Sequence, residues 1–148
     1  MFHFRLPSPI QLADWEHMTI LKIGGRTALD GKMALAKKVI CVDISDTYHN
    51  NKNAVDIKAD AHSLPMLNDE SVDFVASSHT IEHLTNPLKA LREWKRILKT
   101  GGMMYASIPY YKKTFDHKRA ATTLAHLEDD YKKITGWMIR PTVGGFLR

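Results

Sequence analysis

Two aspartates and a pair of glycines follow short apolar runs, where a sheet protein is expected to place its ligand-binding groups. Gly24 and Gly25 end one run, Asp43 closes the next, and Asp60 follows a third. Asp43 stands about 20 residues after the glycines, the spacing expected between a glycine turn and the acid that holds a ribose. Glycine admits a close backbone approach, and a carboxylate can accept hydrogen bonds from both ribose hydroxyls. These residues predict a nucleoside site, although the third glycine of a dinucleotide fingerprint is absent.

Two further groups of residues are candidates for proton chemistry and for binding a second substrate. His79 follows the run 72–76, and an imidazole there can accept a proton near neutral pH. A histidine hydrogen-bonded structurally at the sheet edge is an equal alternative. Asp116, His117 and Arg119 form a polar cluster beyond the last apolar run, beside Tyr110. A solvated loop is the alternative for that cluster.

His79, Glu82 and His83 also fit the H-x-x-E-H metalloprotease pattern. That interpretation needs a long helix with both histidines on one face and a third ligand downstream. Pro87 follows too soon for such a helix, so no metal site is expected. Glu82 and His83 are instead interpreted as turn and capping groups.

The elements that position these residues alternate along the chain. Strands are expected at 19–23, 39–42, 55–59, 72–76 and 103–108, with a short helix within 28–37 and a turn-prone segment at 48–53. Strands separated by helical or turn segments predict right-handed βαβ units and a mainly parallel sheet. In such a sheet the carboxyl ends of the strands share one edge, where ligands bind.

The best helix signal begins after Asn86, a capping residue, with Pro87 at the first helical position. Its apolar stripe is formed by Leu88, Leu91, Trp94, Ile97 and Leu98. Arg96 and Lys99 are expected in the last turn, with Gly101 and Gly102 ending the helix. A second amphipathic helix is marked by Leu124, Leu127, Tyr131 and Ile134.

The charge of the chain is unevenly distributed. Residues 1–88 contain 8 basic and 11 acidic residues, whereas residues 89–148 contain 13 basic and 5 acidic residues. Solvated helix faces explain this equally well, but a basic surface also favours an anionic partner. Nucleic acid is the weaker candidate, because no zinc-finger spacing or aromatic RNA-binding pattern occurs.

Length and composition exclude several classes. The chain has 148 residues, is 44% hydrophobic and is 25% charged, as in a single globular domain. The single cysteine, Cys41, excludes an intrachain disulfide, and its position within an apolar run argues against a reactive thiol. No apolar run approaches the ~20 residues that a membrane helix needs, and no secretory leader is recognised. A cytoplasmic protein without membrane association is therefore expected.

The runs 59–65, 68–75, 78–84 and 91–102 together resemble the class I S-adenosylmethionine-dependent methyltransferases. The similarity is greatest to the small-molecule, type 11 branch, whose segments run D-A-x-x-L-P-F-x-D-x-S-F-D-x-V, E-H-L and E-x-x-R-V-L-K-P-G-G. Here the corresponding residues include Asp60-Ala61, Glu82-His83-Leu84 and Gly101-Gly102. The resemblance covers about residues 19–109. It implies an α/β, Rossmann-like fold with a mostly parallel central sheet and helices on both faces.

The resemblance also implies roles for individual residues. Gly24 and Gly25 would lie against the methionine part of S-adenosylmethionine, and Asp43 would hold the ribose beside Ile44 and the adenine. Asp60 would accept from the adenine amino group, with Ala61 packed nearby. Ser77 and Ser78 would line the floor below the transferable methyl group. His79 would assist catalysis, with Tyr110, His117 and Arg119 facing a small, anionic acceptor.

The sequence departs from the family pattern in its first motif and at its C-terminal end. Lys22 stands where an acid is usual, Arg26 adds a positive charge, and little chain remains for the strands that usually complete the sheet. We interpret 1–148 as one methyltransferase-like domain, with the cofactor-binding core at 19–109 and an acceptor-side or lid region at 110–148. The alternative is a non-catalytic module of the same fold, with a binding or assembly role. An unfinished sheet edge would favour self-association as a homo-oligomer.

Overall fold

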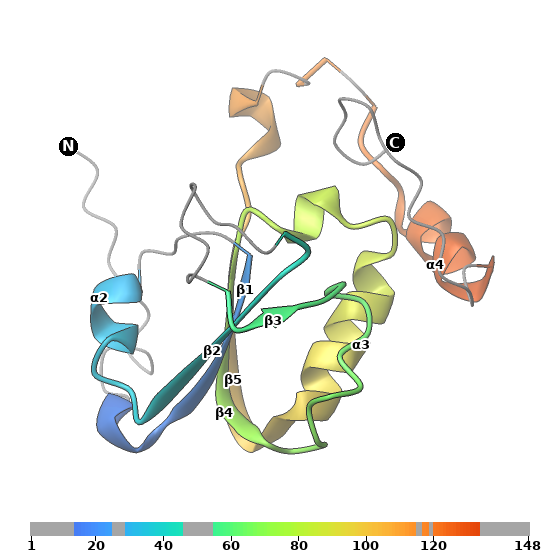
Figure 1. Cartoon of the computed structure of the whole chain (residues 1–148). Coiled ribbons are helices and arrows are strands. Elements are labelled where there is room, and N and C mark those ends of the chain that lie inside the picture. The colour runs from blue at the N-terminus through green and yellow to red at the C-terminus, as the bar shows by residue number, and fades with distance from the viewer. Residues whose placement is uncertain (1–13, 25–28, 46–54, 115–116, 119, 134–148) are drawn as a thin grey trace.

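The computed structural model describes residues 14–24, 29–45, 55–114, 117–118 and 120–133, and these form a layered α/β structure (Figure 1). The predicted fold class is confirmed: a parallel central sheet carries helices on both faces. Its strands are β1 (Thr19–Gly24), β2 (Lys38–Asp43), β3 (Ile57–Lys58), β4 (Val72–Ser78) and β5 (Leu98–Ser107). Within the described residues no helix is long and apolar enough to span a bilayer.

The strand order creates a ligand-binding position beside β1. The order across the sheet is β3-β2-β1-β4-β5, and every neighbouring pair is parallel. The chain moves outward from β1 through β2 to β3, then crosses to β4 on the other side of β1. This reversal is the topological switch point, where ligands of open parallel sheets bind beyond the carboxyl ends of the strands.

Two apolar clusters hold helices against opposite faces of the sheet. Leu21, Ile23 and Val75 point to one face and pack with Trp94 of α3 (Pro87–Ile97). Ile20 and Phe74 point to the other face, where they pack with Trp15, Leu29 and Met33 near α2 (Asp30–Met33). Figure 1 shows α2 and α3 on opposite sides of the strands. Successive side chains of β1 point to opposite faces, so this strand contributes to both apolar clusters, as expected for a sheet covered on both faces.

Helix α3 begins as the sequence predicts but ends earlier. The Asn86 side chain accepts a hydrogen bond from Lys89 N at 3.0 Å, and Pro87 occupies the first turn. The expectation that Lys99 lies in the last turn is wrong, because the helix ends at Ile97 and β5 starts at Leu98. The last helical carbonyls accept hydrogen bonds from Glu70 N and Ser71 N, at the entrance to β4. A tertiary contact, not the glycine pair, therefore ends this helix.

The remaining elements are short, apart from one helix near the C-terminus. They are the 3-10 helices η1 (Trp15–His17), η2 (Ile81–His83) and η3 (Tyr111–Lys113) and the helix α4 (Leu124–Lys133), which packs on α3. The predicted strand at 55–59 is confirmed only over two residues, and the helix expected within 28–37 over four. The turn-prone segment 48–53 lies outside the described residues.

Candidate functional site

Gly24 ends β1 at the switch point, and its conformation requires glycine. Its φ is +74°, and a Cβ built there would lie 2.1 Å from Thr80 Oγ1. The Thr80 hydroxyl donates a hydrogen bond that is shared between two carbonyl oxygens, that of Ile23 at 3.3 Å and that of Ser78 at 3.1 Å. The end of β1 and the segment after β4 are therefore in close contact. Gly25 lies outside the described residues.

Asp43 ends β2 and is joined through the main chain to the segment that carries Asp60. Its carboxylate accepts a hydrogen bond from Ser45 N at 3.0 Å, which forms a turn directly after the strand. Its carbonyl oxygen accepts from Ala59 N at 2.9 Å. Asp43 and Asp60 therefore lie at the same carboxyl edge of the sheet, as the sequence predicts. Ile44, beside Asp43, is 58% exposed.

Asp60 is fixed by a histidine for which the sequence analysis assigned no role. Its Oδ1 accepts from the backbone N of His62 at 2.9 Å and also contacts His62 Nδ1. His62 Nε2 accepts from Asn86 N at 3.1 Å. Because a backbone N–H can only donate, Nε2 carries the lone pair, and Nδ1 is the protonated nitrogen facing Asp60. The Asp60 carboxylate is thereby connected to the start of α3.

The loop after Asp60 is held on the surface of α3 by several hydrogen bonds. Trp94 Nε1 donates to the Ala61 carbonyl oxygen at 2.9 Å, and Glu93 Oε1 accepts from Leu64 N at 2.7 Å. Arg96 donates to the Leu64 carbonyl oxygen at 3.1 Å and to Glu93. The hydrogen bond from Arg96 lowers the pKa of the Glu93 carboxyl, so this anchor stays charged near neutral pH. Ala61 is therefore rigidly placed beside Asp60.

Lys22 is neutralised within the sheet-and-helix packing. Its Nζ lies 3.1 Å from Asp30 Oδ1 of α2, and its side chain is 17% exposed. The neighbouring thiol of Cys41 is half-buried, and this burial raises its pKa. The unusual lysine of the first motif is thus paired with an acid on the α2 side.

Ser77 and Ser78 lie at the end of β4, where the surrounding strands bury them. Ser77 pairs with Ile23 on one side and Ala106 on the other, and the two serines are 1% and 5% exposed.

Tyr110 and His117 lie beyond β5. Tyr110 is 58% exposed, and His117 Nδ1 is 3.0 Å from the Thr114 carbonyl oxygen. Arg119 lies outside the described residues. The structure thus brings the glycine, acid and serine positions to one edge, with Tyr110 and His117 following β5.

His79 and Glu82 form a pair that the sequence analysis did not predict. The main chain of His79 has a φ of +51°, and its N donates to the Ser107 carbonyl oxygen at 3.0 Å. Its Nδ1 lies 3.4 Å from Glu82 Oε1, with side-chain exposures of 64% for His79 and 12% for Glu82. Glu82 and His83 lie in the turn η2, as the sequence predicts, but no side chain caps η2, so the interpretation of Glu82 as a capping group is wrong. Within the described residues, no group of three metal-ligating side chains occurs.

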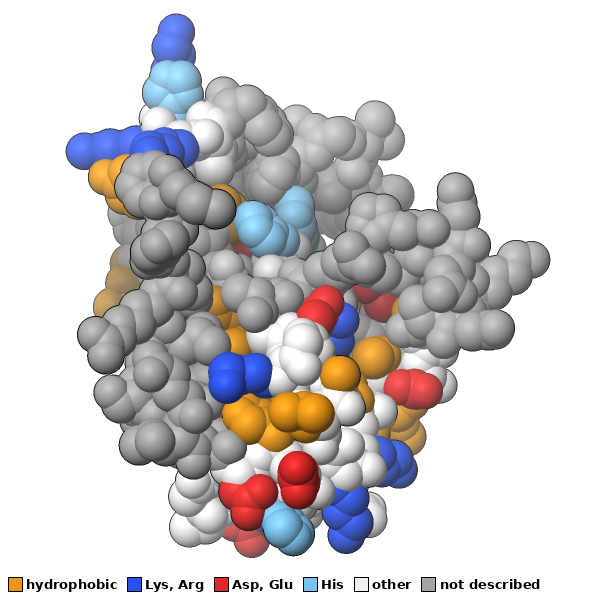
Figure 2. Space-filling view, turned by 90° about the vertical axis from the view of Figure 1, so that its left-hand side faces the viewer, with side chains coloured by type: hydrophobic (Ala, Val, Ile, Leu, Met, Phe, Trp, Pro, Cys, Tyr) orange, Lys and Arg blue, Asp and Glu red, His pale blue; other side chains and the backbone are white. Residues whose placement is uncertain are grey.

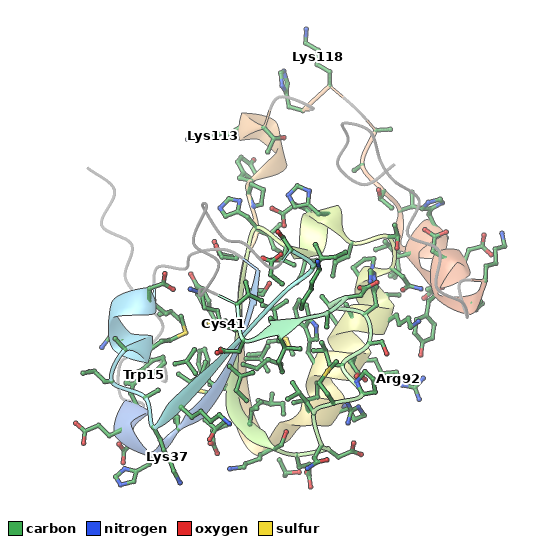
Figure 3. All side chains as sticks on the ribbon, in the orientation of Figure 1. Trp15, Lys37, Cys41, Arg92, Lys113 and Lys118 are labelled. Atoms are coloured by element: carbon green, nitrogen blue, oxygen red, sulfur yellow. The ribbon has the colours of Figure 1, made fainter. Side chains whose placement is uncertain are left out.

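The side-chain views show how these groups are distributed around the sheet. Figure 2 shows histidine side chains in the upper part of one face, with lysine or arginine side chains at its tip. Figure 3 places Lys113 and Lys118 above the carboxyl edge, whereas Lys37 lies at the opposite end of the strands. Basic residues of the segment after β5 therefore lie on the same side of the sheet as the edge that carries Asp43 and Asp60.

Fold and site together define the class: a doubly wound α/β protein whose switch point combines a glycine with two strand-end acids, an arrangement that suits a nucleoside. The family model of the methyltransferase domain, type 11 branch, matches residues 21–106. The chain belongs to this methyltransferase domain family. The match spans the sheet from β1 to β5 and includes each strand-end residue described above.

Solved structures give the same result. A SAM-dependent methyltransferase from Thermotoga maritima is 31% identical, with a TM-score of 0.52, and the match covers 75% of this chain and 54% of that chain. A complex of the Haloferax volcanii Trm112 methyltransferase activator with a methyltransferase matches at 26% identity and a TM-score of 0.52, covering 66% and 48%. A Listeria monocytogenes methyltransferase, 18% identical with a TM-score of 0.58 over 78% and 58%, shares the fold. The chain thus spans about half the length of these structures, and no curated protein matches it significantly.

Three residues of this site escaped the sequence analysis for different reasons. The spacing Asp60-x-His62 could have indicated a local pair, but its continuation to Asn86 depends on how α3 packs. The contact of Thr80 with Gly24 and the burial of Glu82 arise between elements far apart in the sequence, so no local pattern could have indicated them.

Proposed function

We propose that the chain transfers a methyl group from S-adenosylmethionine to a small, anionic acceptor. The observation that carries this proposal is the placement of Asp43 and Asp60 at one carboxyl edge, joined through the Ala59–Asp43 hydrogen bond. Two carboxylates on adjacent strands suit the two ends of one adenosine: Asp43 for the ribose hydroxyls and Asp60 for the adenine amino group.

The described residues fit this cofactor. Gly24 leaves the end of β1 without a side chain at the switch point. The Lys22–Asp30 pair offsets the positive charge that would otherwise repel a sulfonium. Ala61 and Ile44 would border the adenine, and Ser77 and Ser78 would form the floor below the methyl group. Gly25, which lies outside the described residues, is assigned to the methionine part by the family resemblance alone.

When bound, S-adenosylmethionine supplies a methyl group already activated by its positively charged sulfur. The protein therefore mainly holds the acceptor in line with the methyl carbon and excludes water. His79, at the end of β4, is the group we assign to accept a proton from the acceptor. The region 110–148 would form the acceptor side, with Tyr110, His117 and Arg119 as binding residues.

The charge distribution supports an anionic acceptor. Lys113 and Lys118 lie above the carboxyl edge of the sheet (Figure 3). Basic side chains on the same side of the sheet as the candidate site raise the local concentration of anions. Because this attraction is electrostatic, acceptor binding should weaken as salt is raised.

Calorimetric titration of the full chain with S-adenosylhomocysteine tests the cofactor assignment. We expect saturable binding that is weakened at least about 10-fold by Asp43→Ala and by Asp60→Ala, because each removes a charged hydrogen-bond acceptor. Asp129→Ala, on the exposed face of α4, serves as a matched control and should leave affinity unchanged. Absence of binding to the folded wild-type chain, or unchanged affinity in either site variant, would reject the proposal.

A second candidate function is a non-catalytic module that assembles with another protein or with a second copy. It is favoured by β5, which within the described residues pairs only with β4, so its other edge is open to a partner strand. Sedimentation at increasing concentration distinguishes the two candidates. A monomer at high concentration that binds S-adenosylhomocysteine supports the enzyme, whereas self-association without ligand binding supports assembly.

A further inference from the structure

The carboxylate of Glu82 is buried without the hydrogen bonds that such a group normally has. Both of its oxygens are inaccessible to solvent, and neither has a hydrogen-bond partner among the described residues. The polar atom facing it is His79 Nδ1, at 3.4 Å from Oε1. A buried, unsatisfied carboxylate is costly, so its retention beside an imidazole needs an explanation.

The backbone around this pair is held in a fixed and strained conformation. His79 has a φ of +51°, which is uncommon for a residue with a side chain. Its N is bonded to the Ser107 carbonyl oxygen of β5, and the adjacent Thr80 hydroxyl is bonded to the Ile23 carbonyl oxygen of β1. Strained residues that their surroundings fix in this way are concentrated at functional sites.

The orientation of the ring determines which nitrogen can react. Nδ1 is the ring nitrogen within ion-pair distance of the carboxylate, and this negative charge favours the tautomer with the proton on Nδ1 and the lone pair on Nε2. Nε2 lies on the opposite side of the ring from Glu82, and the His79 side chain is 64% exposed. The pair therefore presents an imidazole base to solvent at the switch point, next to the Thr80–Gly24 contact.

We propose that Glu82 is a positioning residue that fixes the tautomer of His79, so that the methyl acceptor is one that must lose a proton, a neutral amine or hydroxyl group. This inference rests on the proposed methyl transfer and specifies its acceptor class. The acceptor's anionic group would be bound elsewhere, by basic residues of the segment after β5 such as Lys113. The reacting atom is the nitrogen or oxygen next to His79.

The proposed transfer conserves both the proton and the electron pairs. The lone pair of the acceptor atom forms the new bond to the methyl carbon, and the bond from that carbon to sulfur breaks with its electron pair going to sulfur. The proton of the acceptor's N–H or O–H passes to His79 Nε2, and the resulting imidazolium is stabilised by the Glu82 carboxylate.

The test does not require the acceptor. The full chain labelled with ¹⁵N reports the His79 tautomer by NMR, and diethyl pyrocarbonate followed by peptide mapping reports the reactivity of its free nitrogen. Glu82→Gln preserves the shape of the side chain and removes its charge. Glu128→Gln, on the exposed surface of α4, is the matched control.

We expect wild type and Glu128→Gln to show the Nδ1–H tautomer and rapid modification of His79. In Glu82→Gln the tautomers should mix and the rate of modification should fall about fivefold, as expected for a base that has lost its orienting carboxylate. Modification of His126 serves as an internal standard. Glu82→Asp, which keeps the charge, should retain most of the reactivity and provides a second variant if Glu82→Gln does not fold.

Binding of S-adenosylhomocysteine separates this inference from the proposed function. Unchanged affinity in Glu82→Gln, with altered His79, supports the inference. An unchanged tautomer and modification rate would overturn it, as would a cofactor affinity weakened about 10-fold without any change at His79, which would assign Glu82 to the cofactor. If the wild-type chain does not bind S-adenosylhomocysteine, the proposed function fails, and the assignment of an acceptor class is withdrawn with it.

Discussion

Gly24 is defined by its backbone and by one neighbour, not by its own side-chain chemistry. Its positive φ excludes most other residues, and Thr80 Oγ1 occupies the space in which a Cβ would lie. The two effects have separate causes, since one is local strain and the other is a contact with a distant segment. Gly24 therefore couples the end of β1 to the segment that carries His79.

We predict that Gly24→Ala destabilises the chain by about 1–3 kcal/mol, because both the strain and the clash with Thr80 must be relieved. Gly31→Ala is the matched control, since Gly31 is helical and nothing lies within 4 Å of its added Cβ. The control should be neutral or stabilising by up to about 1 kcal/mol. Urea unfolding of both variants measures the difference, and equal stabilities would contradict the steric account.

Asn86 connects three parts of the structure and so determines how the elements around the site are held. Its side-chain oxygen caps α3, its Nδ2 donates to the Asp130 carbonyl oxygen of α4 at 3.1 Å, and its backbone N donates to His62. Asn86 is 1% exposed. One residue thus links both helices to the histidine that fixes Asp60.

We expect Asn86→Ala to cost about 1–2 kcal/mol in the free energy of unfolding, mainly through the lost helix cap. Asn86→Ser keeps a capping oxygen but loses the bond to α4, so it should cost less. In both variants the amide protons of α4 should exchange faster. Chemical denaturation and hydrogen exchange measure the two effects, and loss of protection in α4 from the alanine variant alone would disprove the Nδ2 link.

The contrast between the two ends of α3 shows which parts of an element can be predicted. The N-terminus follows from Asn86 and Pro87 because capping is local chemistry. The C-terminus is determined by Glu70 and Ser71, more than twenty positions away in the chain, and the sequence of the helix does not encode that contact. The site follows the same rule: strand-end acids were predictable from their runs, whereas the burial of Glu82 was not.

For the whole molecule, the ion pair of Asp73 with Lys99 and that of Glu93 with Arg96 predict a loss of stability in acid. Burial alone would raise the pKa of the Asp73 carboxyl, but hydrogen bonds from Lys99 and from Thr19 N outweigh it and lower that pKa. Bonding to Arg96 lowers the pKa of Glu93 as well. Both groups therefore stabilise the folded chain above about pH 4, the value for unfolded carboxyls, and cease to do so as the pH falls below it.

Urea denaturation at pH 7 and pH 3.5 tests this expectation. Asp73→Asn and Glu93→Gln should lower stability at pH 7 and reduce the difference between the two pH values. Glu128→Gln, whose exposed carboxylate has no assigned partner, is the control and should behave as wild type. An unchanged pH dependence in both site variants would mean that other carboxylates govern acid unfolding.

The indole of Trp94 has one consequence for experiments on the whole chain. It is fully buried, and its N–H bonds to the Ala61 carbonyl oxygen in the loop beside Asp60. The chain contains two other tryptophans, Trp15 and Trp137, and replacing both with phenylalanine would leave Trp94 as the only indole emitter. Its fluorescence would then report directly on that loop. A ligand that displaces Ala61 would therefore change the Trp94 emission, and no added dye would be needed.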